Sequence, residues 1–187
     1  MPVKLNSSGG GSVTIDVPST ASSYTLTAPA ATATLITTGS SGQVIPKAAL
    51  PTGTVLQVVQ ATTTTQVSTT STSYVSTGFS ASITPTSASS KILIMGSVIV
   101  RVPNDNGNYQ HNIYRNGTTA LAPVAFRGLI QCRGGNYDQT PAFMYLDSPA
   151  STSSTSYVWY HKAESGVTAW FAIDNSYAQL TLMEIAV

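Results

Sequence analysis

The sequence predicts an almost wholly β-sheet protein, with a sandwich or jelly-roll head and an N-terminal arm of short strands. Serine and threonine supply 52 of the 187 residues, and threonine favours strands whereas serine favours turns. Short apolar or alternating runs recur along the chain, and glycine, proline and asparagine turns separate them. No stretch has the periodicity of an amphipathic helix. These observations predict antiparallel strands joined by short connections.

Residues 1–50 are predicted to form the arm. Gly9-Gly10-Gly11 is a flexible break, and short strands are expected at 12–17, 24–27 and 33–37. Strands this short bury little apolar area and are marginal alone, so we expect them to lie on another surface. A disordered leader is the alternative. The candidate anchor side chains are Val13, Ile15, Val17, Tyr24 and Leu26.

Residues 51–187 are predicted to form the head. The Asn116-Gly117 pair predicts a tight type I′ hairpin, and 164–166 predicts a second one. The apolar run 92–100 predicts a strand covered on both faces; a buried helix is the alternative. The predicted strands are 55–59, 66–70, 74–83, 92–100, 109–115, 118–121, 129–133, 142–146, 156–163, 168–173 and 179–186.

The composition excludes several classes of partner. Charged residues make up 8% of the chain and the net charge is +1, whereas nucleic-acid binding needs clustered Lys and Arg. Cys132 is the only cysteine, which excludes an internal disulfide framework and a cysteine-based zinc cluster. No apolar run is long enough for membrane insertion, and residues 1–11 lack the apolar core of a secretory signal. We expect synthesis in the cytoplasm.

The sequence also predicts that the protein is not an enzyme. The nucleophile-elbow pattern fails at the last position of 78–82. We interpret His111 and His161 as half-buried structural residues, and no two acids form a close pair in the sequence. The stretch 103–108 fits an exposed Asx-rich turn better than a calcium loop. No catalytic residue, cofactor or metal site is therefore predicted.

Charge and tyrosine gather in the stretch 101–147, whereas 48–90 contains no charged residue. Arginine and tyrosine are enriched at binding hot spots. The alternative is that these residues are solvated loop charges and core tyrosines. The candidate ligand or partner surface consists of Arg101, Asp105, Tyr109, Arg115, Arg127, Arg133, Tyr137 and Asp138.

The C-terminal strand carries apolar side chains on both faces. We therefore expect it to be covered twice, by the sandwich core and by a neighbouring subunit. Leu182 and Glu184 are the candidate trimer contacts. Because a buried unpaired carboxylate is costly, Glu184 is expected to meet a partner, for which an arginine across the subunit boundary is the candidate.

Two parts of the chain resemble bacteriophage virion proteins. Residues 11–18 and 24–31 are similar to the N-terminal segment of virion proteins from cyanophages and other marine phages. The strands at 53–59, 91–94 and 180–185 look like the trimeric jelly-roll heads, related in fold to tumour necrosis factor and C1q, that phage fibres and decoration proteins carry.

The resemblance implies a homotrimer on the virion surface, synthesised in the host cytoplasm and attached through its arms to the major capsid protein or another virion protein. Because no repetitive shaft separates arm and head, we expect a capsid decoration (cement or head-fibre) protein. A short tail or neck fibre is the alternative. In that alternative, the head binds host-surface glycans through the stretch 101–147.

Overall fold

The computed structural model describes residues 3–6, 8–10, 12–15, 50–103, 107–124, 127–164 and 167–187. The chain divides into two compact units, Met1–Val44 and Ile45–Val187. In the first unit, β1 (Val3–Asn6) pairs antiparallel with β2 (Ser12–Ile15). The expected strands at 24–27 and 33–37 lie outside the described residues, so the arm and its boundary at residue 50 stay predictions.

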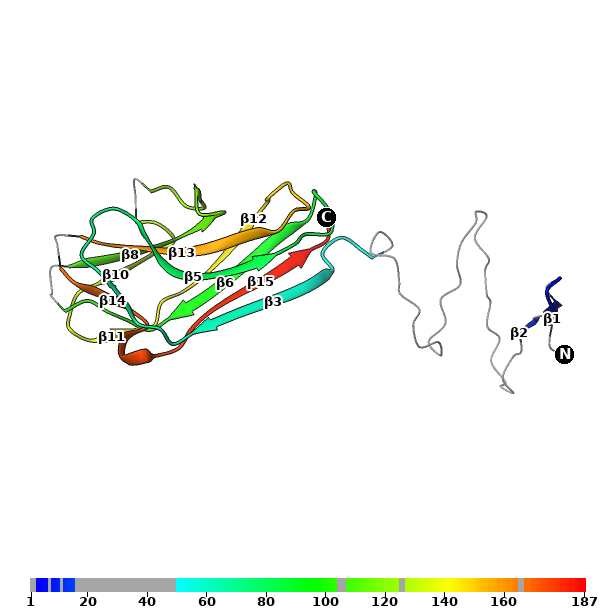
Figure 1. Cartoon of the computed structure of the whole chain (residues 1–187), viewed down its shortest axis with the longest axis horizontal. Helices are drawn as coiled ribbons and strands as arrows, with labels where there is room; N and C mark the ends of the chain where they lie inside the picture. Colours follow the sequence, from blue (N-terminus) through cyan, green and yellow to red (C-terminus); the bar gives the residue numbers. More distant parts are fainter. Residues whose placement is uncertain are drawn as a thin grey trace, which may run out of the picture. The chain divides into compact units, whose positions relative to one another are not determined.

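The second unit is a jelly roll whose eight principal strands form two facing antiparallel sheets, with shorter strands beside them (Figure 1). In chain order, the eight strands pair first with last and then inward, β3·β15, β5·β13, β6·β12 and β8·β10, which is the nested pairing of a jelly roll. The predicted fold class is confirmed. The first sheet is β12 (Ala142–Asp147), β6 (Lys91–Val98), β15 (Ala178–Ile185) and β3 (Val55–Thr63). The second sheet is β10 (Ile130–Arg133), β8 (Asn108–Arg115), β13 (Thr155–Ala163) and β5 (Val75–Ile83).

Four short strands continue the first sheet toward one end of the sandwich. They pair in the same lateral order, β11 (Asp138–Gln139), β7 (Val100–Arg101), β14 (Ala169–Phe171) and β4 (Val67–Thr69). A short 3₁₀ turn, η2 (Ile173–Asn175), joins β14 to β15. The expected hairpin at 164–166 is wrong, because β13 and β14 belong to different sheets.

The Asn116-Gly117 hairpin is confirmed. Asn116 and Gly117 both have positive φ angles, 51° and 69°, as a type I′ turn requires. The turn connects β8 to β9 (Thr119–Ala120), which lies beside the end of β8. The Asn116 side chain accepts a hydrogen bond from the backbone N–H of Ser156, 3.0 Å away, so the turn is also tied to β13.

The core lies between an aliphatic sheet face and an aromatic one. The first sheet contributes Ile92, Ile94, Val98, Leu180 and Leu182, all fully buried. The second sheet contributes buried aromatic rings, Tyr109, Tyr157, Trp159 and Phe79. Full burial of each large side chain contributes roughly 1.5–3 kcal/mol.

Gly96 lets the two sheet faces meet. A Cβ at this position would lie 2.5 Å from Cε1 of Phe143 and 2.7 Å from Cζ3 of Trp159. Because real Cβ atoms do not approach other atoms so closely, the aromatic rings occupy the space that the missing side chain leaves. The glycine inside an otherwise apolar strand is therefore explained by packing.

The expectation that the run 92–100 is covered on both faces is wrong within one chain. Side chains of β6 alternate between buried and half-buried, as those of β15 do. One face of each strand belongs to the core, and the other face lies on the outside of the sandwich. The same sheet is thus apolar on both sides but covered on only one.

Candidate functional site

The residues of the predicted ligand surface do not form one site. Arg101, Asp138 and Arg133 lie at the end of the sandwich where β7, β10 and β11 run, together with the exposed Tyr137. The others lie elsewhere: Arg115 ends β8, Arg127 precedes a bridge between Gly128 and His111, and Asp105 is outside the described residues.

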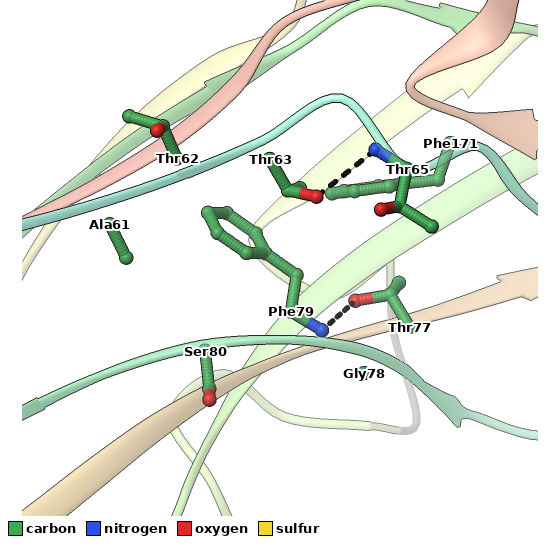
Figure 2. A pocket seen from close by; sticks show the side chains of 9 residues that line it. All are labelled: Ala61, Thr62, Thr63, Thr65, Thr77, Gly78, Phe79, Ser80 and Phe171. Carbon is green, nitrogen blue, oxygen red and sulfur yellow. Dashed lines mark hydrogen bonds between the residues drawn. The ribbon is translucent and has the colours of Figure 1, made fainter. Parts of the chain in front are cut away.

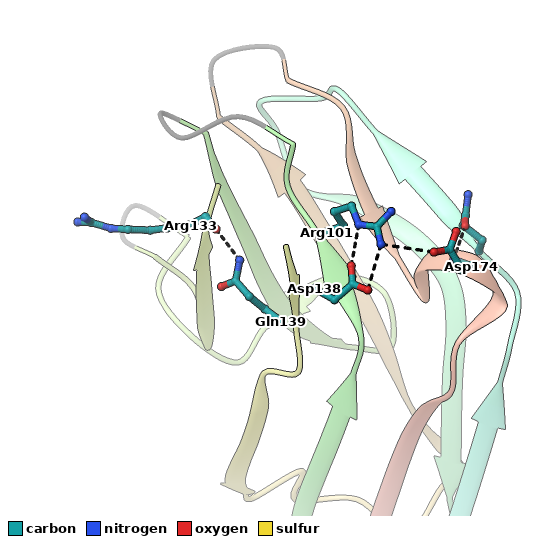
Figure 3. A network of polar contacts seen from close by, with 6 residues as sticks. Arg101, Arg133, Asp138, Gln139 and Asp174 are labelled. Carbon is teal, nitrogen blue, oxygen red and sulfur yellow. Dashed lines mark hydrogen bonds and ion pairs between the residues drawn. The ribbon is translucent and has the colours of Figure 1, made fainter. Parts of the chain in front are cut away.

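Arg101 joins two acids in a polar network (Figure 3). Its Nε and Nη2 donate to the two carboxylate oxygens of Asp138 at 2.7 and 3.0 Å. The same Nη2 contacts Asp174 in η2 at 3.4 Å. The network ties β7, β11 and η2 together, and solvent screens it because all three side chains are substantially exposed. Its arginine is engaged within the chain, which disfavours a role in holding a ligand.

Arg115, the last residue of β8, makes an ion pair that is more buried than the Arg101 network. Its Nη1 lies 2.9 and 2.8 Å from the carboxylate oxygens of Asp147, and the Tyr157 hydroxyl donates to the same carboxylate at 2.8 Å. Asp147 is 7% exposed. Burial and the hydrogen bond to Asp147 raise the pKa of Tyr157. This pair links β12 of the first sheet to β8 and β13 of the second, so we assign it a structural role.

Tyr109 was predicted to lie on the ligand surface, and this prediction is wrong. It is fully buried because it shares the inner face of β8 with His111 and Ile113. Its hydroxyl hydrogen-bonds to Nδ1 of the buried His161. Nδ1 of His111 accepts from the Trp159 indole N–H at 3.1 Å. The two histidines are therefore fully buried core residues, not half-buried ones.

The histidine pair is held neutral by its surroundings. Burial, with a smaller effect of His161, lowers the pKa of His111 to about 3, and burial lowers the pKa of His161 to about 4. Burial also raises the pKa of the Cys132 thiol to about 11, so this cysteine is a poor nucleophile.

Leu182 and Glu184 were predicted to contact a neighbouring subunit, and this prediction is also wrong. Both are fully buried inside their own chain. Backbone N–H and hydroxyl of Thr86 donate to Oε1 of Glu184 at 2.6 and 2.7 Å, and Gln57 donates to Oε2 at 2.6 Å. Burial by itself raises the pKa of Glu184, but these hydrogen bonds lower it below its usual value. No arginine is needed, because uncharged donors already satisfy the carboxylate.

An apolar surface lies on the other side of the same strand. Leu146, Leu93, Met183 and Val58 are cross-strand neighbours in one row that spans all four strands of the first sheet. Met144 and Met95 are opposite each other in the next row, and Ile185 is opposite Val55 beyond the first. We call this set the apolar outer face: Val55, Val58, Leu93, Met95, Met144, Leu146, Met183 and Ile185.

Polar side chains occupy the rest of this side of the sheet, with Ser97, Gln179 and Thr62 in one row and Thr181 and Gln60 beside Met95. Met144 is 72% exposed, and Val58, Leu146 and Val55 are about half exposed. Three of the four methionines of the chain lie here, and Lys91 at its edge is the one charged residue among the described residues of the face. The sequence interpretation found that strand 179–186 was apolar on both sides but assigned its sides the wrong way round.

A pocket of about 380 Å³ opens between the edge strands β3 and β5 (Figure 2). Phe79 projects into it from β5, with Phe171 behind, and threonine residues of the β3–β4 connection line the other side. Its hydroxyls are partly used locally, since Thr63 accepts from the Thr65 N–H and Thr77 from the Phe79 N–H. None of the described residues that line it has a titratable side chain, which disfavours acid–base chemistry.

The described ranges lack two further features. No group of three or more His, Cys, Asp or Glu side chains is arranged to hold a metal ion there. In the same ranges, no helix has both the length and the apolar character that crossing a bilayer requires.

Comparison with known proteins gives a fold-level likeness only. No protein-family model and no curated protein matches the chain. A structure of infectious bursal disease virus, Gx strain, is similar with a TM-score of 0.43 and 18% identity over 71% of this chain and 33% of that one. T=1 particles derived from infectious bursal virus give a TM-score of 0.46 and 17% identity over 77% of this chain and 35% of that one. The VP2 subviral particle of infectious bursal disease virus gives a TM-score of 0.41 and 15% identity over 71% of this chain and 34% of that one. The chain spans about a third of the length of these viral chains.

Proposed function

We propose that the protein is a structural component of a bacteriophage particle, a capsid decoration or head-fibre protein whose heads associate as a homotrimer. The observation that carries this proposal is the apolar outer face, which we take to lie against other copies of the chain. Residues 1–50 then attach the trimer to the major capsid protein or another virion protein. The resemblance of residues 11–31 to phage virion segments supports the phage assignment.

The exposure of large apolar side chains on the apolar outer face favours a partner. The whole outer side of four strands about 4.8 Å apart, each rising about 3.3 Å per residue over eight residues, is roughly 500 Å², and the apolar outer face takes up about half of it. Monomers rarely expose contiguous apolar patches larger than a few hundred Å². Because two identical faces packed on each other would close a dimer, in a trimer the three faces turn together toward the threefold axis, where each contacts both neighbours.

The chemistry of the face favours a second copy of the same chain. Identical surfaces repel each other when they carry like charge, and among the described residues of this face Lys91, at its edge, is the one charged residue. Methionine is enriched at interfaces, and its flexible side chain adapts to an irregular partner. A charged partner, in contrast, would find almost no complementary charge here.

Charge placed on the apolar outer face tests the assembly. The double substitution Met144→Lys and Leu146→Lys lies on the edge strand β12, where lysine is tolerated in a monomer. We expect light scattering at micromolar concentration to give three times the monomer mass for the natural protein and the monomer mass for this variant. Ser82→Lys, on the edge strand of the other sheet, is the control and should remain trimeric.

A monomeric natural protein would contradict the trimer. Antibody labelling of intact particles by electron microscopy tests the location, and we expect label on the capsid. Label confined to the neck or tail would favour the fibre alternative. Deletion of residues 1–42 should abolish binding to particles and leave the far-ultraviolet β-sheet spectrum unchanged.

A further inference from the structure

A second pocket lies on the outer face of the second sheet, away from the apolar outer face. It has a volume of about 380 Å³. The segment before β5 brings Tyr74 beside Lys162, because Val75 pairs with His161 on the adjacent strand. Tyr114 comes from β8. We call it the tyrosine pocket, lined by Thr72, Ser73, Tyr74, Tyr114, Val124 and Lys162.

Tyrosine rings form the floor of this pocket. Tyr114 stacks on Tyr160 with ring centroids 4.1 Å apart and an angle of 29° between the planes. Tyr74 is tilted against Tyr114, with centroids 6.1 Å apart. All three rings are only half-buried, and none of them belongs to the core. Half-exposed rings of this kind offer flat faces to the C–H groups of a ligand.

The rim of the pocket is polar and carries one cation. The Lys162 ammonium lies 5.0 Å from the centre of the Tyr74 ring. Thr72 and Ser73 are exposed on the rim, in a turn that Ser71 fixes by accepting from the Ser73 N–H and donating to the Ser73 carbonyl. Glu164 accepts hydrogen bonds from Asn108 and Gln110, which engage its carboxylate. Lys162 is therefore the charged group that the pocket itself presents.

We infer that the tyrosine pocket binds an acidic saccharide, with a sugar ring packed on Tyr74 and Tyr114 and its carboxylate at Lys162. An aromatic floor matches the apolar face of a sugar ring, and the rim hydroxyls match sugar hydroxyls. The volume falls in the range of small-molecule sites, which favours one or two sugar units. Burial, then Tyr114 and Glu164, raise the pKa of Tyr74 to about 12, so its phenol stays neutral and does not compete for Lys162.

This inference goes beyond the proposed function and does not depend on it, because the pocket and the apolar outer face belong to different sheets. It also differs from the expectation that the stretch 101–147 binds glycans. Of the pocket residues, Tyr114 and Val124 lie in that stretch, whereas the floor and cation also need Tyr74 and Lys162. Strand pairing, not sequence proximity, brings these side chains together.

Calorimetric titration of the full chain with oligogalacturonate, with a neutral maltooligosaccharide of equal length for comparison, tests the site. We expect binding of the acidic chain, at least tenfold weaker binding in Lys162→Met, and unchanged binding in Lys91→Met, which removes a lysine from the other sheet. Tyrosine ring signals in NMR spectra should shift on binding in the natural protein.

Absence of binding to oligogalacturonate would overturn the inference, as would equal affinity of Lys162→Met and the natural protein. Binding of the neutral chain with the same affinity would also overturn the role given to Lys162. Both lysine variants should keep the natural circular dichroism spectrum. Sedimentation of the same samples separates a failure of saccharide binding from a failure of assembly.

Discussion

The two sheets of the head differ on both of their faces. The β12-β6-β15-β3 sheet is mainly aliphatic toward the core and carries the apolar outer face on its other side. The β10-β8-β13-β5 sheet puts aromatic rings and two histidines into the core, and serine, tyrosine and lysine on its outer side. A sheet with apolar side chains on both faces is suited to be covered on both, whereas the second sheet is suited to face solvent on its outer side. Assembly and ligand recognition can therefore occupy opposite sides of one small domain.

Acid should destabilise the head through the two buried histidines of the second sheet, which is the largest effect that we expect. The pKa values of His111 and His161 are lowered in the folded state, so only the unfolded chain takes up protons between about pH 6.5 and 4. Stability is complete above pH 6.5 and falls as the pH decreases through this window. Two such groups lower the free energy of unfolding by about 5 kcal/mol between pH 6.5 and 4.5. Urea denaturation at a series of pH values measures the loss.

A variant assigns the acid effect to the histidines. His161→Gln keeps a hydrogen-bonding group near Tyr109 and removes one of the two titrations, so the pH dependence between 6.5 and 4.5 should fall by about half. Glu184, whose pKa is lowered in the fold, adds acid sensitivity only near and below pH 4.5. An unchanged denaturation midpoint from pH 7 to 4.5 would contradict the neutral histidine core.

Gly96→Ala tests how closely two rings approach β6, Phe143 from the same sheet and Trp159 from the other sheet. The new methyl group collides with Phe143 and Trp159, and overpacking of this kind costs about 2 kcal/mol. Thermal or urea denaturation measures it. Ser82→Ala, at an exposed position of the other sheet, should change stability by less than about 0.5 kcal/mol. A Gly96→Ala protein as stable as the natural one would show that the rings can move aside.

A matched pair of small changes compares the two outer faces directly. Val58→Thr and Val158→Thr make the same substitution, one on each sheet, and both keep a β-branched side chain. Unfolding of the monomer should change by less than about 1 kcal/mol in each case. Only Val58→Thr should weaken self-association, about fivefold by sedimentation. Equal weakening by both variants would mean that the interface does not discriminate between the faces.

Much of the fold could be predicted because local signals decide it. Alternation and turn residues placed the head strands close to their observed positions, and Asn116-Gly117 fixed a hairpin from two residues. Which sheet each strand joins could not be predicted, since pairing such as β3 with β15 depends on contacts far apart in the chain. The same limit explains the error at 164–166, where adjacent strands separate into different sheets.

The candidate sites were harder to predict, because burial decides them. Tyr109 and Ile113 share one face of β8, and this alternation indicates a core position for Tyr109. The charges in the same stretch led instead to its assignment to the ligand surface. Glu184 was expected to meet an arginine of a neighbouring subunit, but Thr86 and Gln57 satisfy it from other parts of its own chain. The tyrosine pocket needs residues from three strands or their connections, so no local pattern predicts it.

The near absence of charge from the apolar outer face decides how association through it responds to conditions. Screening acts on charged groups, so added sodium chloride leaves such a contact almost unchanged. Apolar contact weakens on cooling, because hydration of apolar surface has a large heat capacity. Lowering the temperature should therefore dissociate subunits held by this face more readily than adding sodium chloride does.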